Sequence, residues 1–235
     1  RQESEYWKSI EFSLFHKVAV SYYPSYVEEE AIHAVDETIP VKAITAYVYE
    51  EFLQNLNKDF AKREGLLFVG GFAHPPNADA VLWFAKEVFP KIREQIKVNF
   101  YIVGSKVTDE IKALEQPGNG IIVKGFVSEE ELADLYRNCR IVVVPLRYGA
   151  GVKGKVVEAI YNGAPIVTTS VGSEGIPDVE KVLLVKDQPD EFAETVVELY
   201  KDEKRLEDLA EKTQVYIREH FSIDAAWDVI KEDFE

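Results

Sequence analysis

The sequence predicts an α/β protein with a doubly wound, six-stranded parallel sheet and a helical carboxyl terminus. Between residues 65 and 187, six short apolar runs alternate with stretches of helical periodicity, which is the order of strand–helix–strand units. Some runs, such as 65–71, are continuously apolar, as expected for parallel strands covered on both faces. After Pro189 only amphipathic helical patterns follow.

The composition is that of a globular chain. Of 235 residues, 46% are hydrophobic and 29% charged, and no apolar run approaches the roughly 20 residues that span a bilayer. The net charge of -15 argues against a general nucleic-acid binder but does not exclude a small anionic ligand. The chain starts with a charged, amphipathic stretch, has no signal-peptide pattern and contains no Met. We therefore expect its start to be internal to a longer product or trimmed.

The single cysteine, Cys139, excludes a disulfide within the chain. It lies at the mouth of the apolar run 140–146, so we expect a buried, reduced thiol rather than a nucleophile. A reducing cytoplasm fits this expectation.

The first part of the chain, 1–63, differs from the remainder. It predicts a helix over 7–17, a strand over 17–23, a helix over 24–37 opened by Pro24, and a strand over 40–52. These elements are too few for an independent sheet, so we interpret 1–63 as the tail of a preceding domain with its linker. The domain proper is expected at 64–220, and a last helix at 221–235.

Each element of the main domain has its own sequence signal. Thr108 and Ser128 are expected to cap short helices, the second as a capping box with Glu131, and Ser222 is expected to cap the last helix. Gly163 is expected to end a helix that starts near Lys153. The predicted strands are 65–71, 99–104, 120–127, 140–146, 165–170 and 182–187, and the predicted helices are 77–93, 108–114, 128–138, 153–162, 190–201 and 203–219.

The stretch 145–169 carries the clearest chemical signal. A strand ends at Leu146, a glycine-rich loop follows, and a helix begins near Lys153; free N–H groups at such a helix start suit a phosphate. From residue 141 to 157 there is no acid, whereas Arg147, Lys153 and Lys155 add three positive charges. A solvated loop with stray lysines is the alternative.

Lys155 and Glu158 share one helical face, being three residues apart. Lys155 is placed to meet a phosphate and Glu158 to accept hydrogen bonds from a pair of sugar hydroxyls. An ordinary surface ion pair is the alternative.

A second strand–glycine–helix stretch, 68–81, contains Gly70 and Gly71 before a helix that begins near Asn77. It indicates a phosphate site only weakly, because Gly-Gly after a strand is often a tight turn. The full G-x-G-x-x-G spacing is missing, which argues against a dinucleotide site. No Cys/His spacing predicts zinc, and no D-x-D cluster predicts a metal bridging a sugar diphosphate, so no metal and no cofactor are expected.

Taken together, FVGGFAHPPNADAVLWF, YIVGS, the run from VKGFVSEEELADLYRN to GAGVKGKVVEA, YNGAPIVTTSVGSEGI and the closing helices carry a resemblance. From about Gly65 to the carboxyl terminus, the chain resembles the carboxyl-terminal domain of retaining glycosyltransferases of the GT-B fold, of the family four or "group one" type. The piece FHKVAVSYYPSYVEEEAIHA resembles the last strand and helix of that fold's first domain.

The resemblance implies two Rossmann-like domains facing across a cleft, with a nucleotide sugar bound by the second and no metal required. Lys155 would neutralise the diphosphate, and Glu158 would hold the ribose hydroxyls as the second acid of a Glu-x7-Glu motif. Both are the expected catalytic residues. The expected donor-binding residues are Gly70, Gly71, Asn77, Phe126, Val127, Arg147, Tyr148, Gly149, Ala150, Gly151, Val152 and Lys153, with Phe126 and Val127 against the base.

Two departures qualify the resemblance. Ala150 stands where the motif has its first acid, which contacts the donor sugar, so sugar recognition is expected to differ. Most of an acceptor-binding first domain is also missing, so we expect the fragment alone to be inactive.

The expected function is transfer of a sugar from a nucleotide-diphosphate donor to a hydroxyl acceptor, with retention. The acceptor could be a glycan, a lipid-linked glycan or a small molecule, and membrane association would need the missing parts. The main alternative is a non-catalytic nucleotide-sugar-binding or assembly domain, favoured by Ala150 and the short first part. An epimerase of related fold needs more acids and histidines than this loop offers, and an NAD-dependent dehydrogenase lacks its fingerprint.

Overall fold

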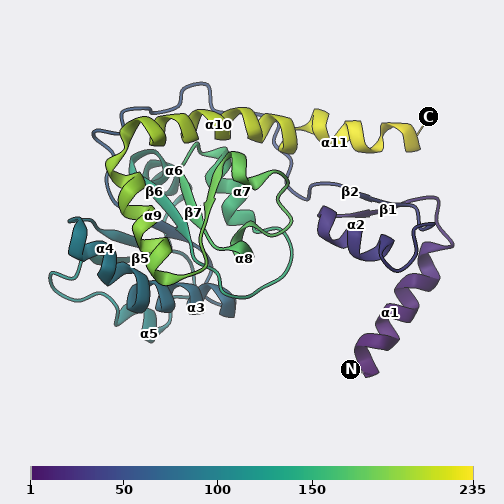
Figure 1. Cartoon of the computed structure of the whole chain (residues 1–235), viewed down its shortest axis with the longest axis horizontal. Helices are drawn as coiled ribbons and strands as arrows, with labels where there is room; N and C mark the ends of the chain where they lie inside the picture. Colours follow the sequence, from purple (N-terminus) through teal and green to yellow (C-terminus); the bar gives the residue numbers. More distant parts are fainter. Residues whose placement is uncertain (1, 235) are drawn as a thin grey trace.

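The computed structural model describes the backbone of residues 2–234, which form a large sheet domain and a smaller amino-terminal part (Figure 1). The sheet domain holds six parallel strands in the order β5-β4-β3-β6-β7-β8. The strands are β3 (Leu66–Val69), β4 (Phe100–Val103), β5 (Ile121–Gly125), β6 (Ile141–Val144), β7 (Ile166–Thr168) and β8 (Leu183–Val185). This order confirms the predicted doubly wound sheet.

Helices cover both faces of this sheet (Figure 1). They are α3 (Pro75–Trp83), α4 (Phe89–Gln95), α5 (Asp109–Lys112), α6 (Glu129–Asn138), α7 (Gly154–Tyr161), α8 (Ser170–Ser173), α9 (Pro189–Lys201), α10 (Glu203–Phe221) and α11 (Ile223–Ile230). A π-helical turn, Phe84–Val88, joins α3 to α4, so the helix predicted over 77–93 is one long segment with a widened turn. Short 3₁₀ turns lie at Val179–Lys181 and Lys231–Asp233.

The predicted helix caps are present, with one difference. The hydroxyls of Thr108, Ser128 and Ser222 each accept a hydrogen bond from the backbone N–H three residues on. The reciprocal half of the capping box is not formed, because the Glu131 carboxylate pairs with Lys124 at 2.8 Å instead. The Lys124 ammonium and the Ser128 backbone N–H compete for the same Glu131 carboxylate.

The core of the sheet domain is aromatic and aliphatic. Phe84, Phe100 and Phe192 are fully buried and bring the long helical segment, β4 and α9 together, with ring centroids of Phe84 and Phe100 4.7 Å apart. Burying side chains of this size is the main stabilising contribution to such a fold.

The amino-terminal part is small, with α1 (Gln2–Phe15), β1 (Ser21–Tyr23), α2 (Tyr26–His33) and β2 (Val41–Ala43). The two strands form a parallel pair and are shorter than the predicted 17–23 and 40–52. The pairing ends with a hydrogen bond from the Ile44 N–H to the Tyr23 carbonyl at 2.7 Å, and 44–65 runs as an irregular linker with one described bridge, from Tyr49 to Ser222. The helix predicted to open at Pro24 begins at Tyr26 instead.

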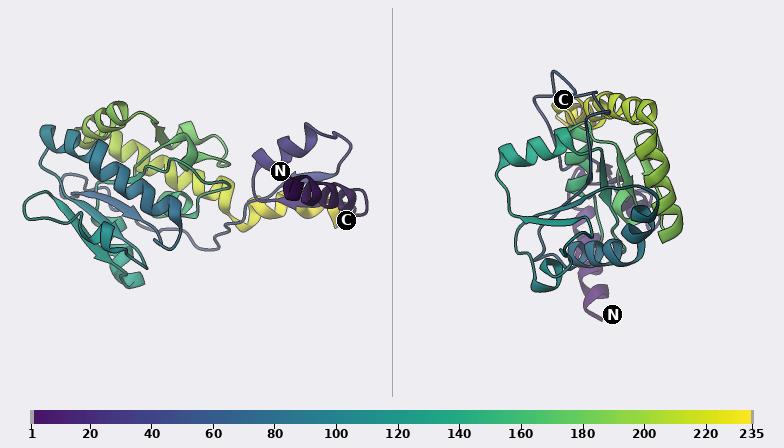
Figure 2. Two further views of the ribbon diagram at one scale, coloured as in Figure 1. Left: turned by 90° about the horizontal axis from the view of Figure 1, so that it is seen from below. Right: turned by 90° about the vertical axis from the view of Figure 1, so that its left-hand side faces the viewer.

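The carboxyl terminus returns to the amino-terminal part. After α10 has crossed the sheet domain, α11 lies beside β1 and β2 (Figure 2, left). There Asp233 accepts hydrogen bonds from Lys42 at 2.7 Å and from Tyr22 at 2.6 Å. Two segments of the chain, the 44–65 linker and the α10–α11 junction, therefore connect the two parts. In the described range 2–234, no helix combines the length and apolar character needed to cross a membrane.

Candidate functional site

The order of the central strands locates the site. β3 and β6 are neighbours, but the chain continues from β3 toward β4 on one side and from β6 toward β7 on the other. In open parallel sheets, ligands bind outside the carboxyl ends of the strands at such a reversal point. The two glycine loops singled out in the sequence, after β3 and after β6, both start at this edge.

The two loops meet at Gly70. A Cβ atom built on Gly70 would lie 3.2 Å from the Cε atom of Lys155 and 3.0 Å from the amide nitrogen of Asn77. The Lys155 side chain therefore passes directly over the backbone of the first loop, and any larger residue at this position would force Lys155 or Asn77 to shift. The structure thus brings together Gly70, Asn77 and Lys155, which were predicted separately.

Lys155 is a half-buried cation without a protein counter-ion. Across the described part of the chain, no hydrogen bond or ion pair engages its amine. Burial, and then the neighbouring charge of Lys153, lowers the pKa of Lys155 to about 8, while Glu158 opposes the shift. An anion placed beside this amine would stabilise its charged form and raise its pKa again, so the site favours an anionic ligand.

Glu158 lies one turn further along α7, also half-buried, and makes no ion pair with Lys155 among the described contacts. The predicted alternative of a surface ion pair therefore does not describe this pair. Burial raises the pKa of Glu158, whereas Tyr136 and Lys155 lower it. The buried Tyr136 hydroxyl is close to the carboxylate but outside ordinary hydrogen-bond geometry. Tyr49 stacks on Tyr161 at 4.2 Å, one turn along the same helix.

The start of α7 has no side-chain cap. Lys153 occupies the capping position without a side-chain hydrogen bond to the helix, and Gly154 is the first helical residue. Tyr47 of the linker lies against this turn: a Cβ on Gly154 would be 2.7 Å from the Tyr47 hydroxyl oxygen. An uncapped helix start beside Lys155 adds N–H groups and a partial positive charge.

The other two cations of the second loop are engaged by the protein. Arg147 forms a two-point ion pair with Asp79, whose Nε–Oδ2 distance is 2.8 Å, and lies over the Trp83 ring. Lys153 is buried and pairs with Glu174 at 3.0 Å. The loop tip between them, residues 148–150, is exposed.

Asn77 has a supporting role in this geometry. Its side chain is 4% exposed and donates to the Gly71 carbonyl at 2.8 Å, while its own carbonyl oxygen is buried without a partner in the described structure. By holding the Gly71 carbonyl on the helix side, it fixes the path of the first loop. Direct contact of Asn77 with a donor stays a prediction.

Phe126 and Val127 lie apart from this centre. They follow β5, which is two strands from β3, or about 10 Å at the usual strand spacing. The Phe126 ring is 82% exposed. An extended ligand with its anion at Lys155 could reach this ring, whereas a compact one could not.

Four contacting residues were missed by the sequence reasoning: Asp79, Glu174, Tyr47 and Tyr136. One signal was available for Glu174, since it follows β7, whose carboxyl end shares an edge with β6. The other three depend on how helices and linker pack against the sheet.

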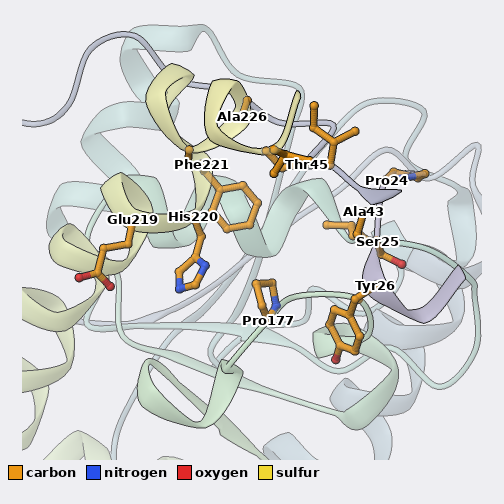
Figure 3. Close-up of a pocket in the computed structure, with 15 residues that line it drawn as sticks. Pro24, Ser25, Tyr26, Ala43, Thr45, Pro177, Glu219, His220, Phe221 and Ala226 are labelled. Atoms are coloured by element: carbon orange, nitrogen blue, oxygen red, sulfur yellow. The ribbon is translucent and has the colours of Figure 1, made fainter. Parts of the chain in front are cut away.

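A cavity of about 290 Å³ lies between the two parts of the molecule (Figure 3). Its lining joins Ser25 of the amino-terminal part, Thr45 of the linker, His220 and Phe221 at the end of α10, and Val152 of the second loop. A Cβ on Gly175 would lie 2.8 Å from the Cβ of Ser25. The amino-terminal part thus touches the edge of the site next to Glu174.

Known proteins are similar to this chain. The family described as "Glycosyl transferases group 1" matches residues 63–202. An "Uncharacterized 44.6 kDa protein in cps region" of Klebsiella pneumoniae is 29% identical over 184 residues, which are 74% of this chain and 45% of that protein. The chain therefore spans less than half the length of this curated relative.

Solved structures share the fold at low identity. TarM superposes with a TM-score of 0.76 at 13% identity, over 97% of this chain and 46% of TarM; a mutant of the S. aureus protein was crystallised with Fondaparinux, alpha-GlcNAc-glycerol and UDP. Anabaena HepE, in complex with UDP and glucose, has a TM-score of 0.67 at 16% identity, over 92% of this chain and 63% of HepE. Sucrose-phosphate synthase of Thermosynechococcus elongatus has a TM-score of 0.69 at 17% identity, over 96% and 60%. These are GT-B structures, as the sequence predicted.

Proposed function

The chain belongs to the group 1 glycosyltransferases, and we propose that it binds the nucleotide-diphosphate sugar from which a sugar is transferred to a hydroxyl acceptor. The observation that carries the proposal is Lys155: a half-buried amine, unpaired among the described residues, that lies over Gly70 beside the uncapped start of α7. No described carboxylate pairs with this amine, and a diphosphate would supply the counter-charge.

In the proposed reaction, the bond between the anomeric carbon and the diphosphate oxygen breaks, a bond from that carbon to the acceptor oxygen forms with retention, and the proton of the acceptor hydroxyl passes to the leaving diphosphate. The negative charge that develops on the leaving diphosphate is stabilised by Lys155 and the helix start. Glu158 would accept hydrogen bonds from the ribose hydroxyls, and Phe126 and Val127 would lie against the base. Because these cationic groups come from the protein, we propose that no metal ion is required.

Uridine nucleotides are the first donors to test, because TarM, HepE and GtfA were each crystallised with UDP. The acceptor is proposed to be a glycan, a lipid-linked glycan or a small molecule. Since the chain spans less than half of its curated relative, we propose that transfer needs the remaining part and that this chain alone binds donor without transferring it. The buried thiol suits a cytoplasmic protein, and that location stays a prediction.

The test is calorimetric titration of the chain with UDP, GDP, ADP and CMP, beside Lys155→Ala. We expect one nucleoside diphosphate to bind, unaffected by EDTA, and Lys155→Ala to weaken it. The matched control is Lys212→Ala, an exposed lysine on α10. Binding that Lys155→Ala leaves unchanged would contradict the proposed role.

A second candidate function is a binding or assembly domain without catalysis. The observation that favours it is Ala150, which leaves the exposed tip of the second loop without an acid. Sugar transfer by a protein that contains this chain together with an acceptor-binding part would exclude it.

A further inference from the structure

A carboxylate that the sequence reasoning did not single out lies at the edge of the site. Glu174 follows α8, just after β7, and its Oε2 atom accepts a hydrogen bond from the Lys153 amine at 3.0 Å. The same amine donates to the carbonyl of Gly151. Since Lys153 occupies the capping position of α7, Glu174 is tied to the loop that leads into the phosphate-binding helix.

The two ends of this ion pair differ in exposure. The Lys153 side chain is 9% exposed, whereas the Glu174 side chain is 36% exposed. A carboxylate has two oxygens and about four acceptor positions. Within the described structure only Oε2 is engaged, so Glu174 is a fixed acceptor with free capacity toward solvent.

The order of the strands gives this carboxylate a place along an extended ligand. Across the sheet edge, Phe126 follows β5, Gly70 and Lys155 lie at β3 and β6, and Glu174 follows β7. From β5 to β7 is four strand spacings, or about 19 Å. With the base at Phe126 and the diphosphate at Lys155, the donor sugar, which is attached to the far side of the diphosphate, lies near the carboxyl end of β7.

Charge explains why the acid is paired. A free carboxylate beside a diphosphate would repel it, but Lys153 neutralises Glu174 and leaves its Oε1 atom able to accept hydrogen bonds. Among the acids of the described structure near this loop, Asp79 is engaged by Arg147, and Glu158 lies one turn beyond Lys155 in the helix.

We propose that Glu174, held by Lys153, accepts hydrogen bonds from hydroxyl groups of the donor sugar and selects which sugar is bound. The inference rests on the proposed function and deepens it. The amino-terminal part touches Gly175, the next residue, so the sugar end of the donor faces the gap between the two parts. This is the side from which an acceptor held by a first domain would approach.

The test compares bare UDP with UDP-glucose, UDP-galactose and UDP-N-acetylglucosamine by calorimetry, using GDP and GDP-mannose if UDP does not bind. Glu174→Gln keeps the shape and an oxygen for Lys153 but removes the charge. We expect it to change the affinity for the bare diphosphate less than about threefold, and to weaken the preferred sugar nucleotide about tenfold or more. The difference in affinity between the preferred sugar nucleotide and the other sugar nucleotides should become smaller accordingly.

The control is Glu180→Gln, an exposed acid nearby, which should change neither affinity. Equal weakening of bare diphosphate and sugar nucleotide by Glu174→Gln would show that Glu174 only holds the loop, and would overturn the inference. No change in either affinity would overturn it as well. If the unaltered chain binds no nucleotide at all, the proposed function fails first and the inference with it.

Discussion

The two glycine loops at the reversal point look alike in sequence but differ in what they offer a ligand. The first leads into α3, whose opening residues Pro75 and Pro76 have no N–H to donate. The second leads into α7, which opens with Gly154 and Lys155. The first loop therefore supplies shape and the second supplies charge. A strand–glycine–helix pattern predicts an anion site only when the first helical residues can donate.

The largest expected effect comes from removing the charge of the second loop. Since burial lowers the pKa of Lys155 from 10.5 to about 8, the charged amine destabilises the empty fold, by an amount of the order of 3 kcal/mol at neutral pH. Lys155→Met should raise the free energy of unfolding while weakening nucleotide affinity about 10- to 100-fold. Thermal unfolding and calorimetry of the same samples check both. A variant that loses stability and affinity together would show that Lys155 is structural.

The pH dependence sharpens the same contrast. The folded-state pKa of Lys155 lies below the unfolded value, so its destabilising effect is complete below about pH 8 and is relieved as the pH rises toward 10.5. Ligand binding needs the protonated amine and should weaken as the pH rises through 8. Titrations between pH 7 and 9.5 should show this fall in the unaltered protein and not in Lys155→Met. The same fall in both would assign it to another group.

Substitution in the first loop tests its role in shape. Gly70→Ala would place a Cβ 3.2 Å from Lys155 Cε and should displace the amine, weakening nucleotide binding several-fold at a stability loss of about 1 kcal/mol. Gly71→Ala, whose Cβ would meet only the Ser105 hydroxyl at 3.4 Å, should leave Lys155 in place. Equal losses of affinity in both variants would indicate instead that a phosphate lies against both residues.

The smallest effect is expected at the outer cation of the second loop. Arg147 is already paired with Asp79 and exposed, so Arg147→Ala should change nucleotide affinity less than about threefold and stability by under about 1 kcal/mol. A loss as large as that of Lys155→Met would mean that the arginine leaves Asp79 when the ligand binds.

The elements of the sheet domain could be predicted from the sequence because the spacing of hydrophobic residues, the helix caps and the glycines that end helices each involve residues close together in the chain. Thr108, Ser128 and Ser222 cap as expected for that reason. The ion pairs of Arg147 and Lys153 could not be predicted from the sequence. Their partners, Asp79 and Glu174, are 68 and 21 residues away and meet them only in the folded chain. The strands predicted over 17–23 and 40–52 were too long because strand length depends on an available neighbour.

The linker and the α10–α11 junction run side by side, joined where the Tyr49 N–H donates to the Phe221 carbonyl at 2.8 Å. Further contacts join these two segments nearby, because the Arg218 guanidinium donates to the Leu53 carbonyl and lies over the Phe52 ring. The linker also reaches the site, since the Tyr49 ring stacks on Tyr161, one turn of α7 beyond Glu158. A movement of the amino-terminal part relative to the sheet domain would therefore be transmitted through the linker to the helix proposed to hold the donor.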